Sequence, residues 1–134
     1  MTYYLKLYLA ILIAFFAIDM VWLGLVARTF YRQQLGFLLA PSPNWLAAIV
    51  FYLLFIAGIL FFVVIPGLEV DSLRATLLRA ALFGLITYAT YDLTNLATLA
   101  GWPVLVTVVD LAWGAFLSAA VTLVSVWAGK RLIK

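Results

Sequence analysis

Residues 45–65 read WLAAIVFYLLFIAGILFFVVI, an apolar run that contains no charged residue. A helix needs about 20 such residues to cross the hydrocarbon core of a bilayer. Three further stretches are similarly long and apolar, at residues 7–27, 80–100 and 104–128. Strands of a membrane barrel would instead be about 10 residues long and alternate in polarity. The sequence therefore predicts an all-α integral membrane bundle of four transmembrane helices, forming a single domain over residues 1–134.

The composition also indicates that most of the chain lies in lipid. Of the 134 residues, 69% are hydrophobic and 10% are charged, whereas soluble domains average about 25% charged residues. Soluble globular and disordered chains are therefore excluded. The chain has no cysteine and no histidine, which removes disulfides, thiolate chemistry and the commonest metal and haem ligands. We expect no cofactor, no metal site and no nucleic-acid partner, and the lipid bilayer as the main partner.

Short polar connections separate the predicted helices. Residues 41–44, Pro-Ser-Pro-Asn, break the chain before the second span, and Pro66-Gly67 is expected to end that span. Asp71 or Ser72 can cap the helix that follows. The turn at residues 101–103, Gly-Trp-Pro, is so short that the third and fourth helices are predicted to be antiparallel neighbours.

The distribution of Lys and Arg predicts the orientation. Arg28 and Arg32 fall on one side of the predicted bundle, and the larger group falls on the other side: Lys6, Arg74, Arg79, Lys130, Arg131 and Lys134. Cytoplasmic loops carry the excess of positive charge, so both termini are predicted to be cytoplasmic. Residues 28–39 mix these two arginines with aromatic residues, which indicates an interfacial helix or an extension of the first span. The alternative is a lid over a functional site.

Three aspartates, Asp19, Asp92 and Asp110, fall inside predicted spans. An ionised Asp near the bilayer centre costs on the order of 2.5–3.5 kcal/mol on insertion scales. With a rise of about 1.5 Å per residue, all three lie roughly 10–13 Å from the outer ends of their helices. We predict that they cluster in the outer half of the bilayer. They would then be protonated groups that donate hydrogen bonds, hold a bound cation, or face a water-filled pocket; alternatively, they join helices by hydrogen bonds.

Polar and aromatic residues accompany these acids. Tyr88, Asp92 and Asn95 share one face of the third span, and Tyr91 and Thr98 broaden that face. Trp22 and Trp113 each follow an aspartate by three residues, and a glycine follows closely in both cases. This repeated motif is consistent with an inverted repeat or with coincidence. Each indole N–H could also donate to a carboxylate on a neighbouring helix. The candidate ligand-binding or proton-coupling residues are therefore Asp19, Asp92, Asp110, Tyr88, Tyr91, Asn95, Thr98, Trp22 and Trp113; no catalytic residue is assigned.

Small residues at Gly114, Ser118 and Thr122 recur every four positions along the fourth span. Such a stripe lets another helix approach closely. Its partner could be a helix of the same chain or a second protomer of a homo-oligomer.

Three stretches carry a resemblance to a known family: residues 18–24, residues 83–98 and residues 102–114. With these, the chain resembles the bacterial membrane proteins grouped as domain of unknown function 2177. The resemblance covers essentially the whole chain. It implies four helices and a multi-pass location in the bacterial inner (cytoplasmic) membrane. It implies no activity and no catalytic residue.

Three functions are compatible with these patterns. The first is a transporter or permeation unit for a proton-coupled or cationic substrate, because titratable acids within a membrane span are typical of such sites. The second is a membrane-embedded binding or enzymatic site for a lipid or another lipophilic small molecule. The third is an accessory or assembly subunit of a membrane complex that docks through the small-residue stripe.

Overall fold

A computed structural model describes residues 2–132 of the chain, and helices are the only regular secondary structure in this part. The first long helix, α1 (Thr2–Val21), runs into a π-helical turn, η1 (Trp22–Val26), and a short helix, α2 (Arg28–Leu35), follows. The second long segment consists of α3 (Trp45–Ile59), a π-helical turn η2 (Leu60–Val64) and α4 (Ile65–Glu69). Two long helices complete the fold, α5 (Leu73–Thr98) and α6 (Val104–Leu132).

Three of these segments are long and apolar enough to cross a membrane: Thr2–Val26, Trp45–Glu69 and Val104–Leu132. They contain or overlap the spans predicted at residues 7–27, 45–65 and 104–128. The remaining predicted span, residues 80–100, lies mostly within α5. That helix has 26 residues, but it is less apolar because it carries Arg74, Arg79, Asp92 and several threonines.

Helix ends follow local sequence with one exception. Ser72 caps α5, since its hydroxyl accepts a hydrogen bond from the Ala75 N–H at 3.2 Å, and Gly101 turns the chain at φ 78°. The prediction that Pro66-Gly67 ends the second helix is wrong, because the helix continues to Glu69. Pro66 lies in the first turn of α4, directly after η2. The helix is continuous there, and a π-helical turn before a proline is one of the adjustments that let a helix accommodate it.

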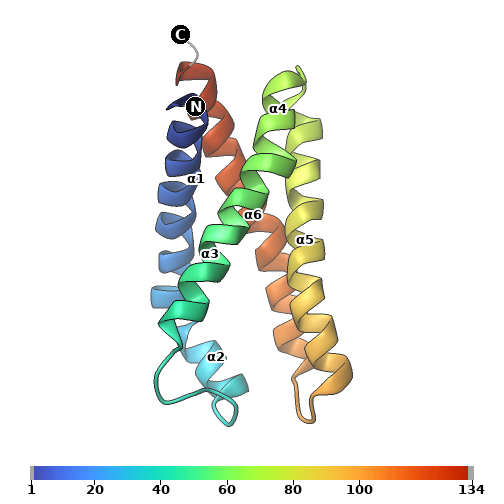
Figure 1. The fold of residues 1–134 in the computed structure, drawn as a ribbon. Coiled ribbons are helices and arrows are strands. Elements are labelled where there is room, and N and C mark those ends of the chain that lie inside the picture. Colours follow the sequence, from blue (N-terminus) through green and yellow to red (C-terminus); the bar gives the residue numbers. More distant parts are fainter. Residues whose placement is uncertain (1, 133–134) are drawn as a thin grey trace.

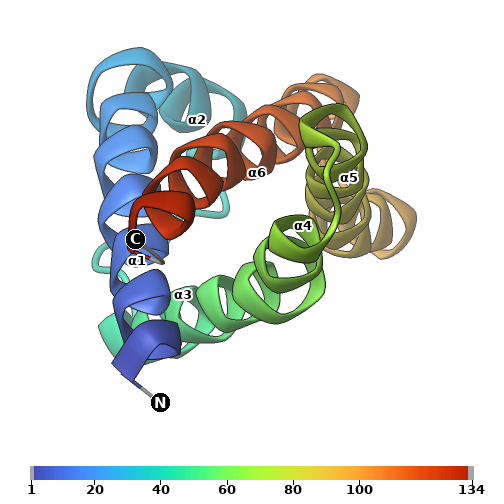
Figure 2. The ribbon, with the colours of Figure 1, turned by 90° about the horizontal axis from the view of Figure 1, so that it is seen from above.

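The long helices form an open frame (Figure 1). The first turn of α1, the α4–α5 connection and the last turn of α6 lie at one end, and α2 and the α5–α6 turn lie at the other. Viewed along the frame, α6 runs from α1 to α5 on one side, while α3 and α4 run from α1 to α5 on the opposite side (Figure 2). The main apolar core joins α1, α3 and α6, with residues of η2, and includes Leu7, Ile11, Phe15, Ile56, Ile59, Leu117 and Val121.

The tightest packing joins α5 to α6. A methyl group at Gly84 would overlap the Gly114 carbonyl oxygen and the Ser118 hydroxyl, and a methyl group at Gly114 would overlap the Tyr88 ring. Ser118 and Thr122 are fully buried. The small-residue stripe of Gly114, Ser118 and Thr122 thus lies within a packed bundle, with Gly114 and Ser118 facing α5 of the same chain.

A valine at Gly84 tests this close approach. Gly84→Val places branched carbon atoms against the α6 backbone, and overpacking of this kind typically costs about 1–3 kcal/mol. We expect a clearly lower thermal unfolding midpoint in detergent. Gly24→Val is the matched control, since nothing lies within 4 Å of a side-chain carbon added there. Equal midpoints for the two variants would contradict the close packing of α5 on α6.

Candidate functional site

A cavity of about 760 Å³ occupies the half of the frame nearest α2. Its wall combines aromatic rings with hydroxyl and carboxyl groups from every long helix. The lining residues are Asp19, Trp22, Leu23, Tyr31, Leu35, Leu39, Phe51, Tyr52, Phe55, Thr87, Tyr88, Thr90, Tyr91, Thr94, Asp110 and Trp113.

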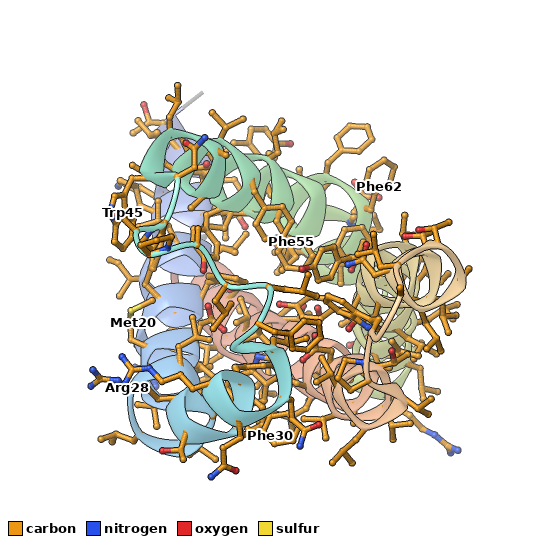
Figure 3. The ribbon with its side chains drawn as sticks, turned by 90° about the horizontal axis from the view of Figure 1, so that it is seen from below. Met20, Arg28, Phe30, Trp45, Phe55 and Phe62 are labelled. Carbon is orange, nitrogen blue, oxygen red and sulfur yellow. The ribbon has the colours of Figure 1, made fainter. Side chains whose placement is uncertain are left out.

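The cavity opens sideways between α3 and α5. These helices approach each other near η2 and separate toward the end of the frame where α3 begins (Figure 1). Four lining residues of these two helices, Phe51, Thr90, Tyr91 and Thr94, are exposed, and Leu23 and Leu39 are exposed at the end near α2. Phe55 points from α3 into the interior, whereas Met20 and Arg28 point away from it (Figure 3). A molecule could therefore enter through this gap without passing the apolar core.

Tyr88 lies near all three aspartates, although these acids come from three helices. Asp19 and Asp110 line the cavity and are 4% and 7% exposed. Asp92 lies behind them beside Asp110, is fully buried and does not line the cavity. Neither carboxyl oxygen of Asp92 has a hydrogen-bond partner among the described residues.

The two Asp-x-x-Trp motifs, residues 19–22 and 110–113, are joined to each other by hydrogen bonds and by ring stacking. The Trp113 Nε1–H donates to Asp19 Oδ1 at 3.3 Å. In the other direction, the Trp22 Nε1–H donates to the Tyr31 hydroxyl at 3.3 Å, and that hydroxyl donates to Asp110 Oδ1. The two indole rings stack with their centroids 4.3 Å apart. Each motif therefore supplies the ring that holds the acid of the other, directly or through Tyr31.

Local helix geometry produces this arrangement. Residues three apart lie side by side on a helix, so each motif presents its acid and its indole together. The chain then widens into the π-helical turn η1, where the Ala27 N–H donates to the Trp22 carbonyl oxygen at 2.7 Å. Single π-helical turns are frequent at functional sites. The turn precedes α2 directly, and α2 brings Tyr31 and Leu35 over the cavity.

Tyr31 is a central residue that sequence reasoning missed. Burial and the neighbouring Asp110 carboxyl raise the pKa of the Tyr31 phenol above its ordinary value. Tyr31 therefore keeps its proton near neutral pH and donates it to Asp110. Its only signal in the sequence is its place in the amphipathic segment 28–39. Tyr52, Phe51 and Phe55 were also missed, because they sit in an apolar run where every residue is suitable for lipid.

Three candidate residues do not reach the cavity. Asp92 is buried behind it, and Asn95 and Thr98 are not among the lining residues. Thr98 is exposed, and its hydroxyl donates to the Thr94 carbonyl oxygen at 2.8 Å on its own helix. The polar face of α5 is broader than the cavity, so helical spacing alone could not separate the lining residues from the rest. Among the candidates, Asp19, Asp110, Tyr88, Tyr91, Trp22 and Trp113 line it.

Replacing Tyr31 with phenylalanine should make α2 more mobile. Tyr31→Phe removes the hydroxyl that joins Trp22 to Asp110, and a hydrogen bond to a charged group contributes about 1.5–3 kcal/mol. The chain has no native cysteine, so a single spin label at Gln33→Cys reports on α2 alone. We expect the label to become more mobile in Tyr31→Phe. Tyr8→Phe is the matched control, because it removes a hydroxyl that donates to Leu53 elsewhere. Unchanged label mobility in Tyr31→Phe would show that this hydroxyl does not hold α2.

Comparisons with known proteins agree with this architecture at the level of the family. No curated protein and no solved structure matches the chain. Residues 4–127 match the model of a family described as predicted membrane protein (DUF2177). That match covers nearly the whole chain, including all three aspartates and both tryptophans of the cavity. The chain therefore belongs to the DUF2177 family of predicted membrane proteins.

Proposed function

We propose that this protein binds a lipophilic molecule of the bilayer in the cavity between α3 and α5. The observation that carries the proposal is the lateral opening, which joins a polar interior to the surface that lipid would cover. Small-molecule sites typically have volumes of about 300–1,000 Å³ and are mostly apolar, with a few polar groups that fix orientation. The cavity has this size, and its aromatic wall surrounds the carboxyls of Asp19 and Asp110.

The proposal includes a fourth membrane crossing, formed by α5. Its threonines support this, because Thr87, Thr90, Thr94 and Thr98 each donate their hydroxyl to a carbonyl oxygen of their own helix. Such internal bonds satisfy the polar atoms that lipid cannot. Arg74 and Arg79 lie near the start of α5, where they could reach a headgroup region. The multi-pass chain would then be a four-helix bundle with intramembrane aspartates.

The charges favour an orientation with the ends of α1 and α6 in the cytoplasm. The described cations of that end are Lys6, Arg74, Arg79, Lys130 and Arg131, while Arg28 and Arg32 belong to the opposite end; Lys134 lies outside the described residues. The positive-inside rule then places the first group in the cytoplasm of a bacterial inner membrane. The cavity and its aspartates would lie in the outer half of the bilayer.

Transport of a proton-coupled or cationic substrate is the second candidate. The acids around Tyr88 favour it, and the π-helical turns η1 and η2 are points where two of the long segments could bend. A substrate would have to pass the buried side chains of Ile11, Ile59 and Leu117, which fill the half of the bundle next to the termini. Binding from the bilayer requires no such separation of packed helices, so we place it first.

The accessory-subunit hypothesis loses its expected docking surface. It assigned that role to the stripe of Gly114, Ser118 and Thr122, but α5 packs against Gly114 and Ser118, and Ser118 and Thr122 are fully buried. A homo-oligomer or a complex would have to form through another face. An enzymatic role would have to use Asp19 and Asp110 as acid and base on the bound molecule.

Single cysteines test the fourth crossing and the orientation. A membrane-impermeant maleimide added to intact cells, or to spheroplasts where an outer membrane is present, should label Gln33→Cys and Ala100→Cys. Asp71→Cys should react only after the membrane is permeabilised. All three positions are exposed. Labelling of Ala100→Cys and Asp71→Cys from the same side would show that α5 does not cross.

A tryptophan at Thr90 tests the cavity as a binding site. Thr90 lines the cavity, and its hydroxyl donates only to the Ile86 carbonyl oxygen of its own helix. Thr90→Trp therefore fills the space without removing a hydrogen bond to another helix. We expect native mass spectrometry of the purified protein to detect less co-purifying lipophilic material than in the wild type. Thr98→Trp is the matched control, since Thr98 makes the same kind of bond outside the cavity. Equal occupancy in both variants would contradict binding in this cavity.

A further inference from the structure

Carboxyl groups and aromatic rings meet in the lining of this cavity. Asp19 and Asp110 line it, whereas no lysine or arginine does. Both residues are more than nine-tenths buried, so water screens them weakly. Asp92 adds a third carboxyl beside Asp110, and its oxygens have no hydrogen-bond partner within residues 2–132. Asp19 and Asp110 therefore present carboxyl oxygens to whatever occupies the cavity, whereas Asp92 lies behind them and does not reach it.

Aromatic rings surround the same acids. Tyr52 and Tyr88 are both near the Asp19 carboxyl, and Tyr88 and Tyr91 are both near Asp110. The stacked indoles of Trp22 and Trp113 complete the wall on α1 and α6. The faces of aromatic rings attract cations, and rings grouped around a site are the usual means of holding alkylated ammonium groups. Carboxyl groups and ring faces thus favour the same chemical group.

We infer that the cavity takes a cationic amphiphile, with its alkylated ammonium head between Asp19, Tyr88 and Asp110 and its hydrocarbon chain leaving between α3 and α5. This inference rests on the proposed binding function and names the class of its ligand. The exposed side chains of Phe51 and Tyr91 stand at the opening, where an alkyl chain would pass from the head site into the bilayer. An anionic head would instead face the carboxyls of the site.

The experiment compares three probes that share a dodecyl chain and differ in the head. Dodecyltrimethylammonium, its uncharged isostere 2,2-dimethyltetradecane, and dodecyl sulfate are each radiolabelled. Each is bound at trace concentration to the full chain in dodecyl maltoside micelles. We expect the ammonium probe to bind at least about tenfold more tightly than the uncharged analogue. We expect dodecyl sulfate to bind more weakly than both.

Charge-neutralising variants locate the effect. Asp19→Asn and Asp110→Asn keep an acceptor oxygen for Trp113 and Tyr31 but remove the negative charge. Each should reduce ammonium binding several-fold more than it reduces binding of the uncharged analogue, and retained binding of that analogue shows that the variant is folded. Asp71→Asn is the matched control, since Asp71 is exposed and does not line the cavity. It should change neither affinity.

Distinct results overturn the inference and the proposed function. Equal affinity of the wild type for the ammonium and uncharged probes overturns the cationic head, even if both bind, and this comparison needs no variant. Failure of all three probes to bind, with no effect of Thr90→Trp on co-purifying material, overturns the binding function itself. Tetramethylammonium separates the two sources of such a head. If it binds within about twofold of the dodecyl probe, the ligand comes from water, and the proposed delivery from the bilayer is wrong.

Discussion

The backbones of α5 and α6 meet at Gly84 and Gly114, and this contact determines where the polar groups of the molecule lie. Because neither residue has a side chain, the two helices approach closely enough for Tyr88 to lie over Gly114. The same approach buries Asp92 completely beside Asp110. With α5 held against α6, α3 packs on α1 and reaches α5 through Phe55, whose ring lies against those of Phe83 and Tyr88. The cavity lies on the α2 side of this contact.

Polar groups in an apolar medium must find partners within the protein, and this chain uses two solutions. The threonines of α5 donate to carbonyl oxygens of their own helix, as Thr90 does to Ile86 at 2.7 Å, so they need no neighbour. Asp19 and Asp110 instead accept from Trp113 and from Tyr31, across helix boundaries. In the proposed fourth crossing, the first solution would let a polar helix face lipid, whereas the second fixes the positions of α1, α2 and α6 relative to one another.

The sequence predicts what depends on local chemistry. Long apolar runs give the helices, Ser72 gives a cap, and Gly101 gives a turn that requires a positive φ. The prediction that the three aspartates cluster rests on their depth along the helices alone, and Asp92 does not line the cavity with the other two. The rest depends on contacts between distant segments: Tyr31 reaches Asp110 over 79 positions, and Tyr52 lies beside Asp19. Asn95 and Thr98 share the polar face of α5 but miss the cavity, because the cavity ends before the helix does.

The two halves of the frame differ in a way that bears on how a ligand could reach the acids. Near the termini, Leu7, Ile11, Ile59 and Val121 are fully buried in one apolar core, and separating them would lose the packing contacts that hold helices together in a bilayer. Near α2, the space is already formed and open toward α3 and α5. Access from the bilayer therefore requires only side-chain motion, whereas passage through the protein requires the core to open. The acids lie on the accessible side of that barrier.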